Sequence, residues 1–205
     1  MKRLRACLRA GGVAVLPTDT VYGLACDPLQ DAAVGQLYEL KGRPPQRPAA
    51  VMFFALDAAL DALPELAERE RAALLALLPG PLTVLLPNRS NRYPLACGSG
   101  ALGLRVPRLP ERLAALETLD VPVMQSSANL SGGVEARRVA DVDGVVLDGA
   151  DLVLDGGELP GVASTVLDLN DFEREGRWRV VREGPLGERE IQVLLGPLER
   201  GAARG

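Results

Sequence analysis

Hydrophobic positions recur along the chain with two different spacings, one helical and one extended. Residues 31–41 place apolar side chains at 33, 34, 37, 38 and 40, which predicts a helix with Asp31 as its N-cap. Gly42 and three prolines follow, so this helix ends at Lys41 and Arg43 lies in the loop beyond it. Helical spacing also predicts helices over residues 65–78, 110–119 and 191–199.

Short apolar runs bounded by turn residues predict strands. These runs cover residues 11–17, 49–56, 82–87, 101–107, 121–125, 143–149, 151–157, 164–169 and 178–184. Helices and strands alternate without a repeat or a long linker, so residues 1–205 are expected to form one α/β domain on a mixed, twisted sheet. Its core is expected over about residues 12–185, with residues 200–205 as a frayed tail.

Composition removes several classes of chemistry. The chain has 205 residues, 47% of them hydrophobic, and can bury a core without disulfides. It has no histidine, which excludes Ser-His-Asp catalysis and His-ligated metals. Cys7, Cys26 and Cys97 are scattered and odd in number, which favours a reducing cytoplasm over a disulfide framework. The longest uncharged stretch, residues 72–88, is broken by Pro79-Gly80-Pro81, so no membrane segment is expected.

Basic charge is carried almost wholly by arginine, which makes the loop KGRPPQRP (residues 41–48) stand out. Lys2 and Lys41 are the only lysines in a chain of net charge −4. Lys41, Arg43 and Arg47 could clamp phosphates, with the lysine as a point charge and the arginines as forks. Cations complementing a helix C-terminus, worth roughly 0.3–1 kcal/mol, are the alternative. That alternative explains one cation but not the retained lysine or the rigid spacing.

Two hydroxyl-rich loops each follow a buried strand. In PTDTVYGL (residues 17–24) the two threonines and Tyr22 could line a ligand site. The alternative is an ordinary turn in which Asp19 and the threonine hydroxyls bond only the local backbone. SSANLSGG (residues 126–133) could present backbone N–H groups to an anion, or form a turn capped by Ser131 or Asn129. No GxxxxGK[ST] sequence occurs, so this loop is not a Walker A motif.

The order PTDTVYGL, KGRP, PGPLT, GLRVP, SSANLSG, STVLDL and VVREG resembles the YrdC family of L-threonylcarbamoyladenylate synthases, over about Gly12 to Pro185. The chain resembles the short, single-domain form. The resemblance implies an α/β fold of YrdC type, a twisted open mixed sheet with flanking helices and a deep basic cavity. It implies a nucleotidyltransferase that joins L-threonine, bicarbonate and ATP into threonylcarbamoyl-AMP and pyrophosphate, for threonylcarbamoyladenosine modification of tRNA. Mg²⁺ is expected to be bound through the ATP phosphates with few protein ligands, and a tRNA-modifying transferase complex is the expected recipient of the product.

The same resemblance implies site residues, taken from the matching motifs. Lys41 and Arg43 would be catalytic, holding the ATP phosphates and the carbamate. Threonine would be bound by Thr20, Arg105, Gln125 and Ser164, and the nucleotide also by Ser127, Asn129 and Arg182.

The chain departs from the family pattern at three positions. Glu135 stands where many relatives have a serine, Met52 where many have a histidine, and Ala101 where a polar residue precedes Arg105 by four. Two other functions stay open. One is an RNA-binding or ribosome-assembly module whose binding weakens with salt. The other is a domain that forms a carbamoyl adenylate from carbamoyl phosphate.

Overall fold

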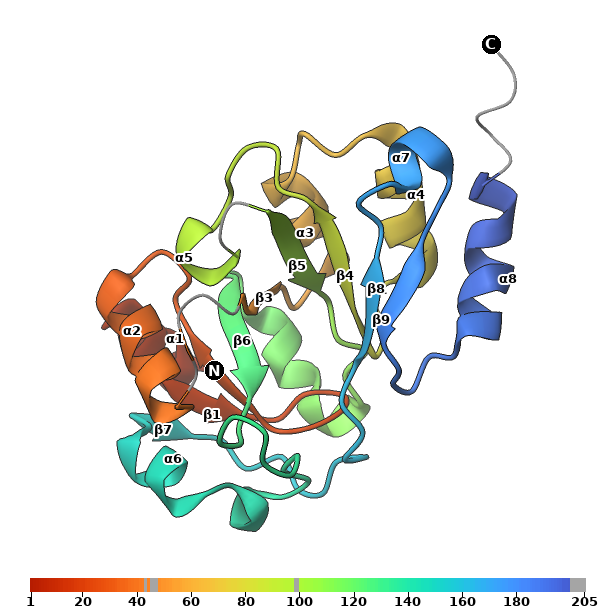
Figure 1. The fold of residues 1–205 in the computed structure, drawn as a ribbon. Helices are drawn as coiled ribbons and strands as arrows, with labels where there is room; N and C mark the ends of the chain where they lie inside the picture. The colour runs from red at the N-terminus through yellow and green to blue at the C-terminus, as the bar shows by residue number, and fades with distance from the viewer. Residues whose placement is uncertain (43, 45–47, 98–99, 200–205) are drawn as a thin grey trace.

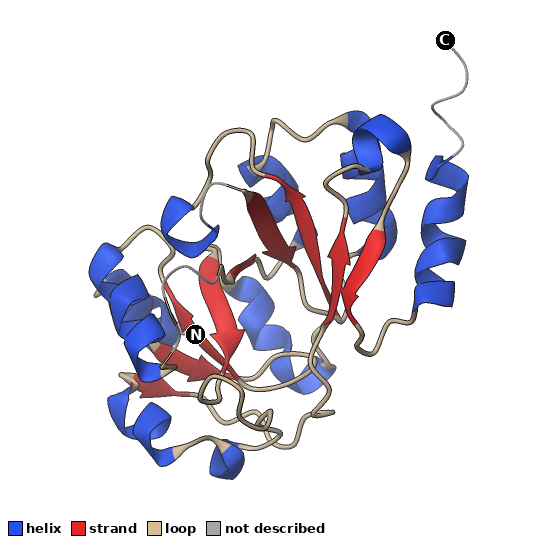
Figure 2. Cartoon of the chain, viewed as in Figure 1, coloured by secondary structure: helices blue, strands red, loops and turns tan. Residues whose placement is uncertain are grey.

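Nine strands form one mixed sheet in the computed structural model, which describes residues 1–42, 44, 48–97 and 100–199 (Figures 1 and 2). The spatial order is β7-β1-β2-β6-β3-β5-β4-β8-β9. The strands are β1 (Ala14–Leu16), β2 (Gly23–Cys26), β3 (Ala50–Met52), β4 (Leu82–Pro87), β5 (Ala101–Arg105), β6 (Val123–Ser127), β7 (Leu152–Val153), β8 (Thr165–Asp168) and β9 (Arg179–Arg182).

Parallel and antiparallel pairs both occur, which makes the sheet mixed as predicted. β1–β7, β3–β5 and β4–β8 are parallel, and the other neighbours are antiparallel. The central strand β6 bonds to β2 on one side and to β3 on the other. Figure 1 shows the twist that results, with β1 and β9 running in clearly different directions.

Helices flank the sheet and cover its edges. They are α1 (Lys2–Arg9), α2 (Asp31–Leu40), α3 (Leu56–Ala62), α4 (Glu68–Leu77), α5 (Pro94–Cys97), α6 (Gly144–Gly149), α7 (Phe172–Glu175) and α8 (Glu188–Glu199), with 3₁₀ helices η1 (Glu111–Thr118) and η2 (Val139–Asp141). α1 and α2 pack on β1 and β2, while α4 packs against α7 and α8. Leu74 of α4 and Ile191 and Leu195 of α8 are fully buried there.

The two faces of the central strands carry different side chains. Successive residues of a strand point to opposite faces. On β5, Leu102 and Leu104 are buried in the core, whereas Ala101, Gly103 and Arg105 face a cavity. β4 repeats the division, because Leu82, Val84 and Leu86 are core and Thr83 and Leu85 face the cavity. The alternation of the sequence therefore separates a packed face from a face open to ligands.

Several predicted elements were wrong. Residues 143–149 form helix α6 instead of a strand, because Asp143 caps the helix by accepting from the Val145 N–H at 2.9 Å. β2 lies in a stretch predicted as loop, and the strand predicted over 49–56 ends at Met52, before α3. α1 was not predicted, and the helix predicted over 110–119 is the 3₁₀ helix η1.

Candidate functional site

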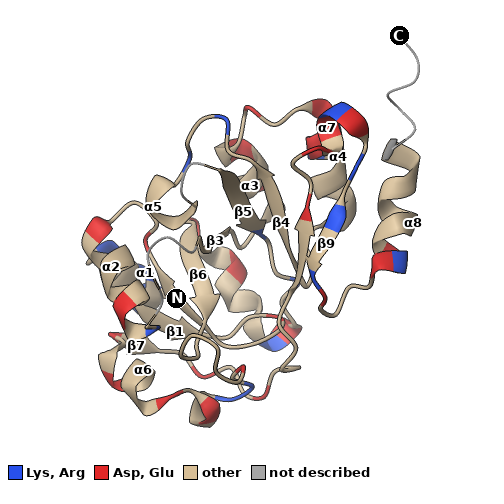
Figure 3. Ribbon diagram, in the orientation of Figure 1, with Lys and Arg blue, Asp and Glu red and all other residues tan. Residues whose placement is uncertain are grey.

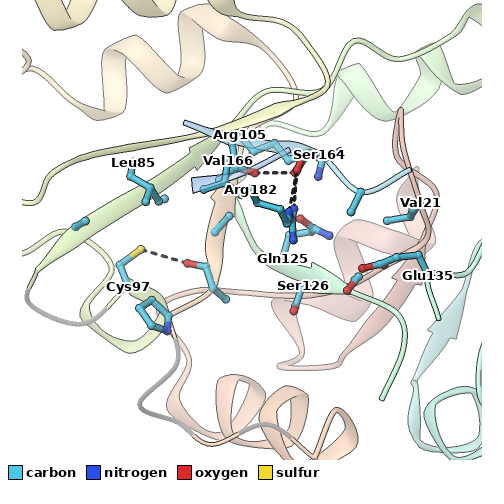
Figure 4. A pocket seen from close by; sticks show the side chains of 18 of the residues that line it. Val21, Leu85, Cys97, Arg105, Gln125, Ser126, Glu135, Ser164, Val166 and Arg182 are labelled. Atoms are coloured by element: carbon cyan, nitrogen blue, oxygen red, sulfur yellow. Dashed lines mark hydrogen bonds between the residues drawn. The ribbon is translucent and has the colours of Figure 1, made fainter. Parts of the chain in front are cut away.

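A cavity of about 620 Å³ opens on the side of the sheet opposite the packed face. Its lining residues come from strands that are distant in sequence. Figure 4 shows Arg105 of β5, Gln125 of β6, Ser164 just before β8 and Arg182 of β9 directed toward one space. The charged residues among those lining it are Arg105, Arg182 and Glu135. Four of the predicted site residues thus share one cavity, and Ser127 also lines it.

Small residues form the floor of this cavity. Ala50 pairs with Gly103 in the β3–β5 register, and Ala101 lies two residues before Gly103 on the same face. A Cβ added at Gly103 would lie 3.3 Å from the Ala50 Cα, so the backbones approach closely here. These small side chains leave the space above them open in the part of the chain that the structure describes.

Arg105 is anchored on one edge of its guanidinium group. Its Nη2 donates to Asp19 Oδ1 and to Thr20 Oγ1, each at 2.6 Å, and to Thr18 Oγ1 at 3.3 Å. The side chain is 3% exposed, and its Nε has no hydrogen-bond partner among the described residues. A buried donor of this kind is costly unless a ligand accepts from it, and a carboxylate is a suitable acceptor.

Asp19 is the site residue that sequence reasoning missed. Its carboxylate is 5% exposed, pairs with Arg105, and also accepts from the Arg108 N–H at 2.9 Å. Thr20, predicted to touch threonine, is fully buried, is bonded to Arg105 and Thr18, and does not line the cavity. The loop 17–24 therefore orients Arg105. The sequence feature that could have identified Asp19 is its position between Thr18 and Thr20, shortly after a strand.

Gln125 is held in the cavity wall by a close approach of β2. The side chain is 5% exposed, and Gly23 lies beside it across the β2–β6 pair. A Cβ at Gly23 would come 2.5 Å from Gln125 Nε2. Glycine at this position therefore leaves the amide its space.

Ser164, Thr83 and Arg182 form a hydrogen-bonded cluster on the opposite wall. Thr83 Oγ1 and Ser164 Oγ are 3.1 Å apart, and Arg182 Nη2 donates to Ser164 O at 2.7 Å and to Ser164 Oγ at 3.1 Å. A bulge places Arg182 there, because Val166 pairs with Arg182 while Leu167 pairs with Val180. Thr83 was not predicted, and it joins β4 to this cluster.

Lys41 connects the end of α2 to the loop after β6. Its buried Nζ donates to Ser127 O at 2.6 Å, Asn129 Oδ1 at 2.8 Å, Asn129 O at 3.0 Å and Ser127 Oγ at 3.2 Å. Ser131 N donates back to Lys41 O at 2.9 Å. The structure thus brings Lys41, Ser127 and Asn129 together, although only Ser127 of the three lines the cavity. Arg43 and Arg47 lie outside the described residues.

Cys97 and the departures from the family pattern complete the surroundings. Burial raises the pKa of the Cys97 thiol, which lines the cavity, to about 11, so it stays protonated at neutral pH and is no thiolate nucleophile. Met52 is fully buried and pairs with Arg105 in register, but it does not line the cavity. Ala101 and Glu135 do line it, and Glu135 Oε2 is buried without a hydrogen-bond partner among the described residues.

The described part of the chain contains no group of three or more His, Cys, Asp or Glu placed to hold a metal ion. Within the same residues, no helix combines the length and apolar character needed to cross a membrane.

Known proteins resemble this chain over most of its length. The threonylcarbamoyl-AMP synthase of Bacillus subtilis is 32% identical over 200 residues, covering 94% of this chain and 56% of that protein. The threonylcarbamoyl-AMP synthase of Xanthomonas campestris (strain B100) is 37% identical over 161 residues, covering 77% of this chain and 86% of that protein. The chain thus spans a little over half of the first relative and most of the second.

Solved structures share the fold. The crystal structure of P. abyssi Sua5 complexed with L-threonine superposes with a TM-score of 0.81 at 29% identity, covering 95% of this chain and 57% of that one. E. coli YciO gives a TM-score of 0.75 at 27% identity and covers 93% of each chain. A family model described as "Telomere recombination" (Sua5, YciO and YrdC proteins) matches residues 6–184. The predicted α/β fold with a twisted open sheet is confirmed, and the chain belongs to the Sua5/YciO/YrdC family.

Proposed function

We propose that this chain is a threonylcarbamoyl-AMP synthase, consuming L-threonine, bicarbonate and ATP. The observation that carries the proposal is the buried Arg105 guanidinium, anchored by Asp19 and Thr20 while its Nε has no hydrogen-bond partner among the described residues. A site of this form suits a small carboxylate ligand. Relatives named threonylcarbamoyl-AMP synthase, at 32% and 37% identity, support the assignment, as does the related Sua5 structure that contains L-threonine.

The chemistry needs no covalent participation by the protein. The threonine amine forms a C–N bond with carbon dioxide from bicarbonate, giving a carbamate and releasing water. A carbamate oxygen then attacks the α-phosphorus of ATP, and the bond from that phosphorus to the bridging oxygen breaks. The products are threonylcarbamoyl-AMP and pyrophosphate. The task of the protein is to position anionic reactants and to stabilise the charge that develops, which a histidine-free chain can do.

The proposed roles follow the positions of the side chains. Arg105 binds the threonine carboxylate, and Gln125 and Ser164 line the same pocket, while Thr20 acts by holding Arg105. The nucleotide is contacted by Ser127, Asn129 and Arg182. The phosphates and the carbamate are bound by Lys41 and Arg43. The contacts of Lys41 with Ser127 and Asn129 support a role for the lysine in fixing the loop that receives the nucleotide.

Other parts of the proposal concern cofactor, partners and location. Mg²⁺ bound to ATP would neutralise phosphate charge. We also propose that residues 1–205 act as one domain, that a tRNA-modifying transferase complex receives the product, and that the protein works in the cytoplasm. The free thiols of Cys7, Cys26 and Cys97 agree with a reducing compartment.

Threonine-dependent pyrophosphate release tests the proposal. Purified protein with ATP, Mg²⁺, bicarbonate and L-threonine should release pyrophosphate and form threonylcarbamoyl-AMP, detected by mass spectrometry. Omitting threonine or bicarbonate should abolish both signals. Activity with carbamoyl phosphate in place of threonine and bicarbonate would instead identify a carbamoyl-adenylate former. Salt-sensitive RNA binding without turnover would identify a binding module.

A further inference from the structure

Glu135 presents a carboxylate to the cavity without a partner from the described residues. The side chain is half-buried, and its Oε2 is buried without a hydrogen bond. Figure 4 shows it reaching from the loop after β6 toward Ser126. The arginines that follow it are engaged elsewhere, since Arg137 pairs with Glu158 at 2.7 Å and Arg138 with Asp141 at 3.2 Å. Glu135 is therefore the charged lining residue whose partner within the described protein is missing.

The backbone on both sides of Glu135 is fixed. The adjacent Ala136 accepts a hydrogen bond from the Tyr22 N–H at 3.0 Å, and Ala128 N donates to Tyr22 O at 2.8 Å. Within the loop, Asn129 Nδ2 donates to Gly133 O at 2.6 Å. The loop is thus tied to the sheet at both ends and braced across its middle. The orientation of Glu135 into the cavity follows from this support.

The proposed nucleotide site creates an electrostatic conflict at Glu135. Two residues assigned to the nucleotide are close to Glu135 in the chain: Ser127 ends β6, and Asn129 lies in the loop that leads from it to Glu135. In a partly buried site, a carboxylate and a nearby triphosphate repel each other because both are negatively charged. A neutral hydrogen-bond donor, such as a serine hydroxyl, would not cancel this repulsion. A divalent cation between the two anions removes it. Mg²⁺ is commonly held by one or two carboxylates together with substrate phosphates, so a single glutamate is sufficient.

We infer that Glu135 is a protein ligand for the divalent cation that accompanies ATP. The inference rests on the proposed function, and it identifies a residue that selects the metal-bound form of the nucleotide. The cation is bound jointly by the Glu135 carboxylate and the phosphates. Nucleotide affinity should therefore depend on the metal more strongly than in a site that lacks this carboxylate.

Metal binding in the presence of a non-reactive nucleotide tests the inference. The probes are Mn²⁺ and α,β-methylene-ATP, whose bridging carbon prevents pyrophosphate release. Free Mn²⁺ is measured by electron paramagnetic resonance, and nucleotide affinity by calorimetry with Mn²⁺ or with EDTA. Mutating a residue that merely orients a protein ligand of a metal typically lowers metal affinity by about 10–100-fold. Because Glu135 is itself the proposed ligand, Glu135→Gln should weaken Mn²⁺ binding to the nucleotide complex by at least about tenfold. Glu135→Asp, which keeps a carboxylate, should restore part of it.

Glu117→Gln is the matched control, because it removes the same charge from an exposed glutamate on η1. It should leave Mn²⁺ binding unchanged, and thermal denaturation should show that every variant is folded. Wild-type Mn²⁺ affinity in Glu135→Gln would overturn the inference. An equal loss of nucleotide affinity with Mn²⁺ and with EDTA would also overturn it, because Glu135 would then bind the nucleotide directly. If the wild-type protein binds no nucleotide at all, the proposed function fails as well.

Discussion

In the guanidinium of Arg105, Nη2 is held by protein acceptors, whereas Nε has no hydrogen-bond partner among the described residues. Asp19 and Thr20 fix Nη2, so the orientation of the group is set before any ligand enters. Preorganisation of this kind removes the cost of ordering a long side chain upon binding. A lysine would keep the charge but lose both the anchored edge and the planar donors, so the substitution is not conservative here.

We therefore expect Arg105→Lys to weaken threonine binding by at least about tenfold, the equivalent of one charge-assisted hydrogen bond. The KM for threonine in the pyrophosphate-release assay should rise by the same factor, while ATP affinity stays close to wild type. Arg112→Lys is the control, since Arg112 is exposed on η1 and its side chain donates to the backbone carbonyls of Gly156 and Glu158. An unchanged KM for threonine in Arg105→Lys would contradict the assigned role.

Two buried thiols are expected to make the stability of the protein decrease with pH in the alkaline range. Burial is the main cause that raises the pKa of Cys26 to about 12 and that of Cys97 to about 11. In the unfolded chain a thiol ionises near pH 8.5, so the native state binds more protons above that pH. The protonated thiols contribute fully to the free energy of unfolding when the pH is below their pKa in the unfolded chain. That contribution is lost as the pH rises through their pKa values in the native state.

The free energy of unfolding should accordingly fall between neutral pH and about pH 10. Urea unfolding at several pH values measures this fall. In the Cys26→Ala/Cys97→Ala double variant the starting stability is lower, but the fall with pH should be shallower. Identical pH slopes in the two proteins would show that these thiols do not ionise differently in the native and unfolded states.

At the scale of elements, β9 reaches the cavity because its end passes very close to the start of β8. A Cβ at Gly184 would lie 2.3 Å from Thr165 N and 2.5 Å from Ala163 O, both backbone atoms that cannot swing aside. Glycine at 184 therefore allows the approach that brings Arg182 onto Ser164.

Gly184→Ala should force β9 away from β8 and destabilise the protein by about 1–3 kcal/mol, the usual cost of overpacking. Nucleotide affinity should fall with it, because Arg182 no longer reaches Ser164. Gly187→Ala is a matched control, since the nearest atom to its Cβ would be the flexible Glu190 Oε2 at 3.6 Å. Chemical denaturation and calorimetry of the two variants give the comparison. Wild-type stability in Gly184→Ala would show that the strands tolerate separation.

Sequence patterns predicted those elements whose periodicity is long or uninterrupted. α2 and α4 were predicted because their apolar residues keep helical spacing, and β4 and β5 because they alternate or run apolar. β2 was missed since its sequence GLAC has no alternation and is buried between two strands. α6 was mistaken for a strand because a short apolar run fits either structure until its cap is known.

The candidate site shows the same division. Motif resemblance selected Arg105, Gln125, Ser127, Ser164 and Arg182, which line one cavity. It did not supply the Arg105–Asp19 pair, because these residues are separated by 86 positions and meet only through the tertiary fold. Thr83 escaped notice for a similar reason, since its partner Ser164 lies 81 positions away. Pairings of this range depend on strand order, which a single sequence does not reveal.

At the scale of the whole molecule, exposed charges form local pairs, such as Arg174 with Asp171 at 2.7 Å and Arg138 with Asp141 at 3.2 Å. Figure 3 shows basic and acidic positions side by side at α7. A net charge of −4 does not favour general attraction of polyanions. Binding of the proposed anionic nucleotide would therefore depend on the cavity, which is lined by residues of β3, β4, β5, β6, β8 and β9. Ligands placed there contact strands across most of the sheet and should stabilise the fold as a unit.

Mass action sets the size of that effect. ATP with Mg²⁺, or L-threonine, each added alone at about 100 times its dissociation constant, should add roughly 2.7 kcal/mol to the free energy of unfolding. For a chain of this length the melting temperature should then rise by roughly 5–10 °C. Ala101→Leu would fill the floor of the cavity, so this variant should fold but lose the ligand-induced rise. Ala115→Leu, an exposed position on η1, should keep it. Equal rises in both variants would mean that the ligands bind elsewhere, because a leucine at position 101 and a ligand above Gly103 compete for the same volume.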